Sequence, residues 1–341
     1  MKFSLSIRFA LFSLLLLPFS NSCNRRAEYL TVEGFTQGTT YHISYSPDVD
    51  FQADSLVEAL LFRIDTSLSV YNPNSLISKV NRNETELPDQ PFLRVFTRAK
   101  EIWQATGGAF DVSGAPLFDA WGFGFKKRDS VTPPMIDSIL NFVGMDKISI
   151  SGGRVVKSDN RVSVNFNAIA QGFTSDFIAE EFDRTGIKNY MIEVGGEIFC
   201  RGLNPKGKFW RVGIDRPTEG NITPGEDLQD ILEISGKGLA TSGNYRKYYE
   251  SDGLKYSHTI DPRSGYPVRH SLLSATVIAA DAMTADALAT FFMVVGLEGA
   301  KEFLKLNSGI DAYLVYSEKD GLRVFKTPGV KGGRSHSFQK R

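Results

Sequence analysis

Strand-like and helix-like segments follow one another along this chain of 341 residues without the strict alternation of a βαβ protein. Residues 39–45 (TTYHISY) alternate and are rich in β-formers, which predicts a strand. Residues 54–68 carry apolar side chains at helical spacing, which predicts a helix capped by Asp54 or Ser55. Further helices are expected at 93–106, 133–143, 168–184, 284–295 and 298–306, and further strands at 147–150, 154–157, 161–166, 191–201, 210–214, 228–234, 274–279, 312–316 and 322–325. This order predicts an α+β fold with helices packed on mixed sheets.

The first 22 residues have the pattern of a secretory signal. Lys2 and Arg8 precede an apolar run at 9–19, which is shorter than the ~20 residues that a membrane-spanning helix needs. The run is followed by Ser20-Asn21-Ser22-Cys23, which resembles a lipobox. In that pattern Cys23 is acylated and becomes the mature N-terminus. The alternative is ordinary signal cleavage, with no role for Cys23.

These features predict a lipid-anchored protein of the bacterial cell envelope that faces the periplasm. Several acyl chains on one residue anchor a protein stably, whereas a single chain binds only marginally. We expect a signal peptide at 1–22, a lipid-anchored tether at 23–30, one folded domain at 31–328 and a flexible tail at 329–341, which is rich in Gly, Ser and Lys.

Charge and cysteine content exclude several functional classes. The 39 Lys and Arg residues balance 39 Asp and Glu residues, whereas a nucleic-acid surface needs a basic excess. Two cysteines and four histidines leave little for a Cys-rich zinc site or a histidine cluster. A metal, if one binds, is therefore expected to be held by oxygen atoms. Cys200 lies in an apolar run and is expected in the core rather than as a nucleophile.

Two motifs in the first half of the chain suit a ligand. Residues 107–124 alternate glycines, aromatic residues and Asp111. Glycine lets a backbone approach a ligand, and aromatic rings offer flat faces to a ring system. Residues 164–176 lead from a strand through amides into a helix, whose first N–H groups suit a phosphate. The alternatives are a turn-rich loop with buried aromatic residues and an ordinary strand-to-helix turn.

Two further motifs lie in the second half. Residues 240–268 gather hydroxyls, an arginine and a turn that runs from His258 to Asp261 and a proline. His258 can accept a proton near neutral pH, because the ordinary histidine pKa is ~6.5, or it caps the turn. Asp286 and Thr290 are four residues apart and share a helical face. This all-oxygen pair suits Mg²⁺; the alternative is an ion-paired or capping Asp286 and a Thr290 bonded to its own helix.

Together and in this order, the motifs resemble the ApbE family of FAD:protein FMN transferases, from about residue 34 to residue 325. Each piece is weak alone, but eight pieces in register are specific. The pieces are Gly38-Thr39-Thr40, residues 71–81 (YNPNSLISKVN), residues 108–111, residues 168–172, Gly195-Gly196-Glu197, residues 241–245, residues 258–265 and residues 285–290.

The resemblance implies a T-fold-like catalytic unit at 31–328 that binds FAD with Mg²⁺. Such enzymes transfer the FMN half onto a Thr or Ser hydroxyl of a partner protein and release AMP. The acceptor lies in a short motif of the type Asp-x-x-Ser/Thr-Gly-Ala-Thr/Ser, and typical partners are membrane electron-transfer subunits. The resemblance implies metal ligands at the Ala168 carbonyl, Asp286 and Thr290, and flavin contacts at Gln37, Tyr71, Ala109, Phe110, Asp111, Asn165, Gln171 and Ile260.

Transfer to a hydroxyl also needs a base within reach of its proton. His258 is our candidate for this base, with Asp261 as its orienter. The same residues also fit two other functions. One is an FAD pyrophosphatase that uses water as acceptor and gives FMN and AMP. The other is a lipoprotein that binds FAD without reaction.

The chain departs from the family pattern at several positions. An amide can bond to flavin or phosphate edges, but it carries no charge. The departures are Asn165 where many members have Asp, Gln171 where they have Lys or Glu, Gln37 where Met is common, and Glu197 where Asp is common.

Overall fold

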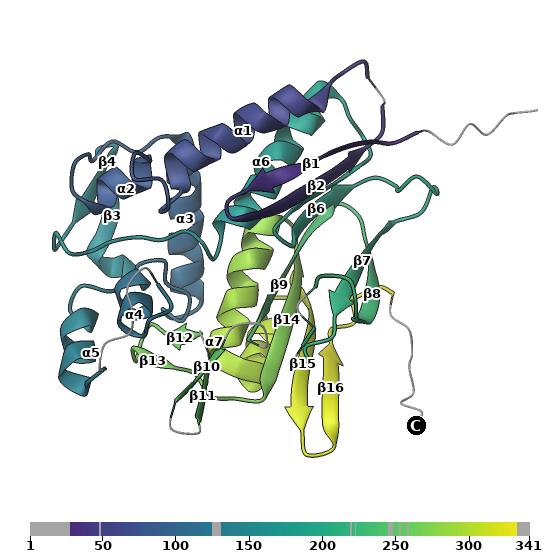
Figure 1. Ribbon diagram of the computed structural model, residues 1–341. Coiled ribbons are helices and arrows are strands. Elements are labelled where there is room, and N and C mark those ends of the chain that lie inside the picture. Colours follow the sequence, from purple (N-terminus) through teal and green to yellow (C-terminus); the bar gives the residue numbers. More distant parts are fainter. Residues whose placement is uncertain are drawn as a thin grey trace, which may run out of the picture.

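An eight-stranded sheet forms the centre of the computed structural model, in the order β1-β2-β5-β6-β9-β14-β15-β16 (Figure 1). Every pairing within it is antiparallel. The strands are β1 Leu30–Thr36, β2 Thr39–Tyr45, β5 Tyr190–Val194, β6 Glu197–Arg201, β9 Lys237–Gly243, β14 Leu272–Ala279, β15 Asp311–Glu318 and β16 Gly321–Lys326. The structure describes residues 28–47, 49–124, 131–218, 220–221, 223–244, 248–251, 254–257 and 259–332.

Helices cover one face of this sheet. Helix α6 (Ala170–Thr185) packs on β5 and β6, and α7 (Ala282–Leu306) packs on β9 and β14. Helix α1 (Ala53–Leu68) packs against α6, and α3 (Gln90–Ala105) packs against α7. The main core fills the space between these helices and the sheet. Helices α6 and α7 are also in contact with each other. Their N-terminal turns lie side by side, since Gly172 of α6 bonds to Asp286 of α7.

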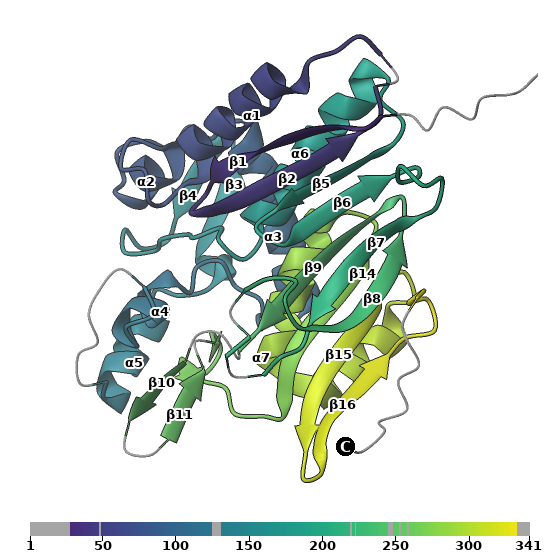
Figure 2. The same ribbon diagram turned by 45° about the vertical axis from the view of Figure 1, so that its right-hand side comes forward.

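The opposite face of the sheet is covered by the hairpin of β7 (Trp210–Asp215) and β8 (Leu228–Ile234) (Figure 2). Its apolar side chains pack with outward-facing residues of the sheet in a second core cluster. Alternate residues of a strand point to opposite faces, so Leu239 joins this cluster while Ala240 joins the main core. Cys200 is buried in the second cluster, which confirms its prediction as a core residue.

Shorter elements gather at one end of the helical layer (Figure 1). Side chains from α4, α5 and β12 form a third core cluster that includes Leu117, Trp121, Ile136 and Ile260. The elements are α2 Leu76–Asn81, α4 Ala115–Ala120, α5 Pro133–Leu140, a 3₁₀ turn at Met145–Lys147, β3 Ile148–Ser151, β4 Arg154–Lys157, β10 Tyr248–Ser251, β11 Leu254–Ser257, β12 Ile260–Asp261 and β13 Tyr266–Pro267.

Helix α7 bends at Gly296, whose φ of 72° and ψ of −173° are not helical. Near this break, the ring Nε2–H of His270 donates to the carbonyl of Met293 at 2.8 Å. The two helices predicted at 284–295 and 298–306 are therefore the two halves of α7. Among the described residues, α7 is the helix long and apolar enough to cross a membrane, but most of its apolar stretch is buried in the core.

The α+β class is confirmed, but the sheets of the described residues are antiparallel rather than mixed, and several other sequence predictions need correction. The strand predicted at 191–201 is two strands, since Gly195 and Gly196 have φ values of 69° and 105° and turn the chain into the β5–β6 hairpin. Residues 161–166 form no strand. The segments 30–36, 76–81, 115–120 and 237–243 form elements that were not expected.

Both predicted ends of the folded domain also move outward. Tyr29, assigned to the tether at 23–30, packs its ring 5.8 Å from that of Trp210, and Leu30 already begins β1. At the other end, Val330 is buried, and the carbonyl of Lys331 accepts the N–H of Glu233 at 3.0 Å. Residues 329–332, assigned to the tail at 329–341, are thus part of the fold.

Candidate functional site

The predicted metal ligand Asp286 lies in the first turns of α7, where α6 crosses it. Its side chain is buried, and Oδ2 accepts the N–H of Gly172 at 3.1 Å. Glycine at position 172 permits this approach, because a Cβ there would lie 2.3 Å from the carbonyl oxygen of Ala282. The crossing therefore brings the segment that leads into α6, including Ala168, to the same end of the helical layer as Asp286.

A second acid from α6 fixes the start of α7. The carboxylate of Asp176 accepts the N–H groups of Ala282 and Met283, both at 2.8 Å. Asp281 accepts the N–H of Thr284 at 2.7 Å and caps the helix. Burial raises the pKa of Asp176 to about 8. These contacts hold the first turn of α7 against α6.

Thr290 lies one turn after Asp286 and faces the sheet. Its Oγ1 is 3.4 Å from Oγ of Ser242 on β9. Next to Ser242 on β9, the hydroxyl of Thr241 lies 2.8 Å from that of Thr276 on β14. The bond to Ser242 holds the Thr290 hydroxyl at the interface between α7 and the sheet, four residues from Asp286.

Glu197, the first residue of β6, brings a second buried carboxylate to Asp286. Burial and the nearby charge of Asp286 raise the pKa of Glu197 well above its ordinary value, and burial also raises the pKa of Asp286. Within the described part of the chain, no Lys, Arg or His forms an ion pair with either acid. Glu197 Oε2 has no hydrogen-bond partner there. Buried carboxylates with an unsatisfied oxygen, a hydroxyl and a main-chain carbonyl fit a hard divalent cation such as Mg²⁺.

Several predicted flavin contacts surround the start of α6. Gln37 lies in the β1–β2 turn with a φ of 50° and donates through Nε2 to Oγ1 of Thr174 at 2.7 Å. Gln171 packs against the β5–β6 turn, since a Cβ on Gly195 would lie 2.6 Å from Gln171 Nε2. Gln37 thus reaches from the β1–β2 turn to α6, and Gln171 reaches from α6 to the β5–β6 turn.

Tyr71 and Asn165 are linked through Asn167. Tyr71 is 67% exposed, and its hydroxyl accepts a hydrogen bond from Asn167 Nδ2 at 3.2 Å. Asn165 Oδ1 accepts the N–H of Asn167 at 2.9 Å, and the Asn165 N–H donates to the carbonyl of Val112 at 2.7 Å. The exposed ring of Tyr71 therefore lies beside this segment.

The loop at 109–111 contributes its main chain and one acid. The side chains of Ala109 and Phe110 are buried in the core, so a ligand can meet only their backbone. Asp111 accepts the N–H of Ser113 at 2.7 Å and the N–H of Met145 at 3.2 Å. Burial raises the pKa of Asp111.

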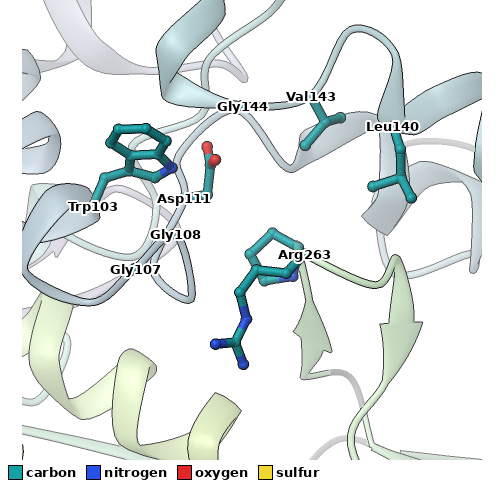
Figure 3. Close-up of a pocket in the computed structure, with 9 residues that line it drawn as sticks. Trp103, Gly107, Gly108, Asp111, Leu140, Val143, Gly144 and Arg263 are labelled. Carbon is teal, nitrogen blue, oxygen red and sulfur yellow. The ribbon is translucent and has the colours of Figure 1, made fainter.

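Beside Asp111 lies a cavity of about 280 Å³. Figure 3 shows Trp103 and Asp111 on one side of it and Arg263 on the other. The glycine-rich loop and the turn after β12 both line this cavity. The predicted contact Ile260 precedes that turn as the first residue of β12, and its side chain lies in the third core cluster.

Asp261 is engaged within its own turn. Its Oδ1 accepts from Arg263 Nε at 2.9 Å and its Oδ2 from Arg263 Nη2 at 2.7 Å. The Arg263 N–H donates to Oδ1 as well, at 2.9 Å. His258 lies outside the described residues, as does Cys23. The roles of Asp261 and His258 as orienter and base stay predictions.

Comparison with known proteins now identifies the family. The model of the ApbE family matches residues 37–314. This chain belongs to the ApbE family. It is 35% identical to the FAD:protein FMN transferase of Vibrio cholerae over 334 residues, which covers 94% of this chain and 97% of the relative. It is 34% identical to the protein of that name from Haemophilus influenzae over 316 residues, 88% of this chain and 90% of the relative.

Solved ApbE structures share the fold. The flavin transferase ApbE from Vibrio cholerae superimposes with a TM-score of 0.79 at 32% identity, covering 89% of this chain and 98% of that chain. The apo form of the flavinyl transferase ApbE from Pseudomonas stutzeri gives a TM-score of 0.78 at 31% identity, with coverage of 88% and 95%. The family resemblance inferred from the motifs is thereby confirmed.

Three residues at this ApbE site lie within the predicted motifs but were given no role of their own. They are Asp176, Glu197 and Ser242. Glu197 carried a signal, because it belongs to the Gly195-Gly196-Glu197 piece of the family resemblance. Asp176 and Ser242 lie in the motifs at 164–176 and 240–268, but their contacts could not be predicted, since their partners lie on elements distant in sequence.

Proposed function

We propose that this chain is an FAD:protein FMN transferase, which moves FMN from FAD to a Thr or Ser hydroxyl of a partner protein and releases AMP. One observation carries the proposal. The family's 168–172 and 285–290 motifs meet at the crossing of α6 and α7, where Gly172 donates to Asp286. The curated relatives that match this chain over most of its length carry that enzyme name.

The reaction replaces the phosphoanhydride bond of FAD with a phosphoester bond to the acceptor. The acceptor oxygen forms a bond to the phosphorus of the FMN half, and the bond from that phosphorus to the bridging oxygen breaks. AMP leaves with the bridging oxygen, and the acceptor hydroxyl loses its proton. We assign that proton to His258 as base, with Asp261 orienting it through the turn that Arg263 stabilises.

The Ala168 carbonyl, Asp286 and Thr290 are the residues that would hold Mg²⁺. When bound, the ion supplies positive charge that neutralises and positions the two phosphates. The chain's own contacts prepare this site: the Gly172 N–H orients the Asp286 carboxylate, and Ser242 orients the Thr290 hydroxyl. Gln37, Tyr71, Asn165, Gln171 and the 109–111 backbone are proposed to position the FAD.

The proposed location is the bacterial cell envelope. The signal pattern at 1–22 and Cys23 support export and lipid anchoring, with the folded domain in the periplasm. A transferase there would meet membrane electron-transfer subunits whose acceptor threonine or serine is exposed on the same side. The neutral charge balance supports a protein acceptor rather than a nucleic acid.

Co-expression with an acceptor fragment tests the function. The fragment carries an Asp-x-x-Thr-Gly-Ala-Thr segment, and its intact mass is measured. We expect the mass of FMN minus water to be added, and we expect no addition when the acceptor hydroxyl is removed or in Asp286→Asn. Release of FMN and AMP without a mass shift on the acceptor would show a pyrophosphatase instead, and FAD bound but unchanged would show a binding protein.

A second experiment tests His258. His258→Ala should bind FAD as the unmodified chain does, because the base acts on the acceptor proton and not on FAD. It should transfer FMN at least about a hundredfold more slowly, the usual contribution of a general base. Transfer at the unmodified rate would rule out this role.

A further inference from the structure

Glu197 has no task in the reaction assigned so far, although it is a buried acid at the site. It begins β6 directly after the Gly195-Gly196 turn, and 7% of its surface is exposed. Its carbonyl accepts the hydroxyl of Ser175 on α6 at 2.8 Å, so the residue is fixed between the sheet and that helix. Its side-chain Oε2 is buried and has no hydrogen-bond partner in the described structure.

The surroundings of Glu197 add negative charge. The acids that act on it are Asp286 and Glu193. Glu193 is engaged elsewhere, since its Oε1 accepts the N–H of Gly196 at 2.6 Å. An unpartnered buried carboxylate is costly, and a second one beside it increases the cost. The pair of Glu197 and Asp286 is therefore completed by either a shared proton or a bound cation.

The donor atoms favour the cation. A shared proton would join the two carboxylates and need nothing else, but the Thr290 hydroxyl stands one turn from Asp286, fixed by Ser242. Oxygen donors of this kind are the ligands of Mg²⁺ and similar hard ions. A divalent charge also balances two carboxylates, which one proton does not.

We propose that Glu197 holds the divalent cation of this site jointly with Asp286, with the unpartnered Oε2 of Glu197 as the donor. This assignment rests on the proposed function only in that the cation serves the FAD phosphates. It makes the Gly195-Gly196-Glu197 motif a part of the cation site rather than a structural hairpin. The Gly-Gly turn then has a purpose, because it places the first side chain of β6 within electrostatic reach of Asp286.

Direct binding of Mn²⁺, a paramagnetic substitute for Mg²⁺, tests the proposal. Free Mn²⁺ is measured by electron paramagnetic resonance during titration of the folded protein, alone and with FAD. The variants are compared with the unmodified chain in whichever of these two states, with or without FAD, the unmodified chain binds Mn²⁺. Glu197→Gln should bind Mn²⁺ at least about tenfold more weakly, the usual effect of losing a group that supports a metal. Glu197→Asp keeps the charge and should stay within a few fold.

Glu193→Gln is the matched control, since it makes the same chemical change on the same hairpin, at an acid engaged by Gly196. It should bind Mn²⁺ as the unmodified chain does. Glu197→Leu removes the charge and the hydrogen-bonding groups together. It replaces Glu197→Gln if that variant does not fold, and we expect the same loss of Mn²⁺ affinity. Equal Mn²⁺ affinity in the folded charge-removing variants would overturn the proposal, as would absence of Mn²⁺ binding by the unmodified chain in both states.

The two proposals fail separately. Mn²⁺ binding that depends on Glu197, in a chain that never modifies an acceptor, would refute the transferase and leave the cation site standing. Transfer of FMN, together with unchanged Mn²⁺ affinity in Glu197→Gln, would refute the role of Glu197 alone.

Discussion

Asp176 shows how one residue couples the stability of this fold to pH. Its carboxyl is buried, and burial raises its pKa to about 8, far above the ~3.9 of an unfolded chain. The folded protein therefore holds this proton more tightly than the unfolded chain does. The stability that the fold gains from this tighter proton binding is fully present below about pH 4. It is lost as the pH rises through about 8.

Asp176→Asn removes this titration while keeping the shape and an acceptor oxygen. We expect its melting temperature, relative to that of the unmodified chain, to rise between pH 5 and pH 9, because only the unmodified chain pays for a buried charge at high pH. Melting curves followed by circular dichroism across this range measure the difference. A difference that stays constant with pH would contradict the raised pKa.

At this scale the sequence predicts residues that belong to short motifs. Asp286 and Thr290 were found because helical spacing places them on one face, and Cys200 because an apolar run predicts burial. The contacts that complete the site join distant segments: Asp176 with Ala282, and Ser242 with Thr290. No local pattern contains such pairs, so they become visible only when the chain is folded.

The crossing of α6 and α7 is the element-scale feature on which the site depends. Gly172→Ala would place a Cβ 2.3 Å from the Ala282 carbonyl oxygen, so the helices would have to separate. We expect a loss of about 1–3 kcal/mol in the free energy of unfolding, the usual cost of overpacking, measured by urea denaturation. FAD affinity should fall with it, since the bond from Gly172 to Asp286 lengthens.

Gly309→Ala is the control for this substitution, because a Cβ at Gly309 meets nothing within 4 Å. It should change the free energy of unfolding by less than about 0.5 kcal/mol. A Gly172→Ala chain as stable as this control would mean that the crossing tolerates a wider spacing than the structure has.

Elements themselves were predicted where their periodicity is strong. Residues 39–45 and 228–234 are strands over the ranges expected. The 191–201 run was misjudged, because its apolar pattern continues through two glycines whose positive φ values make the turn. Sheet order could not be predicted, since β6 pairs with β9 although the β7–β8 hairpin lies between them in sequence.

At the scale of the whole molecule, the C-terminal segment closes the second core cluster. Val330 packs there, and Gly332 pairs with Leu232 of β8. A chain ending at Pro328 should melt a few degrees below a chain ending at Gly332, because burial of a valine contributes about 2 kcal/mol. Differential scanning calorimetry of the two truncated chains isolates these four residues, and equal melting temperatures would show that they contribute no stability.

Helix α7 has one more consequence, for the passage of the chain through a membrane. A chain that crosses the membrane unfolded presents residues 282–306 to the translocation channel as an apolar segment of near-spanning length. An acid within such a segment opposes its transfer into lipid by about 3 kcal/mol. Asp286 would therefore favour complete export of the segment, in addition to the cation binding proposed for the folded enzyme. Replacing it by alanine would favour arrest in the bilayer, so Asp286→Asn, which keeps the segment polar, is the substitution that isolates its chemistry.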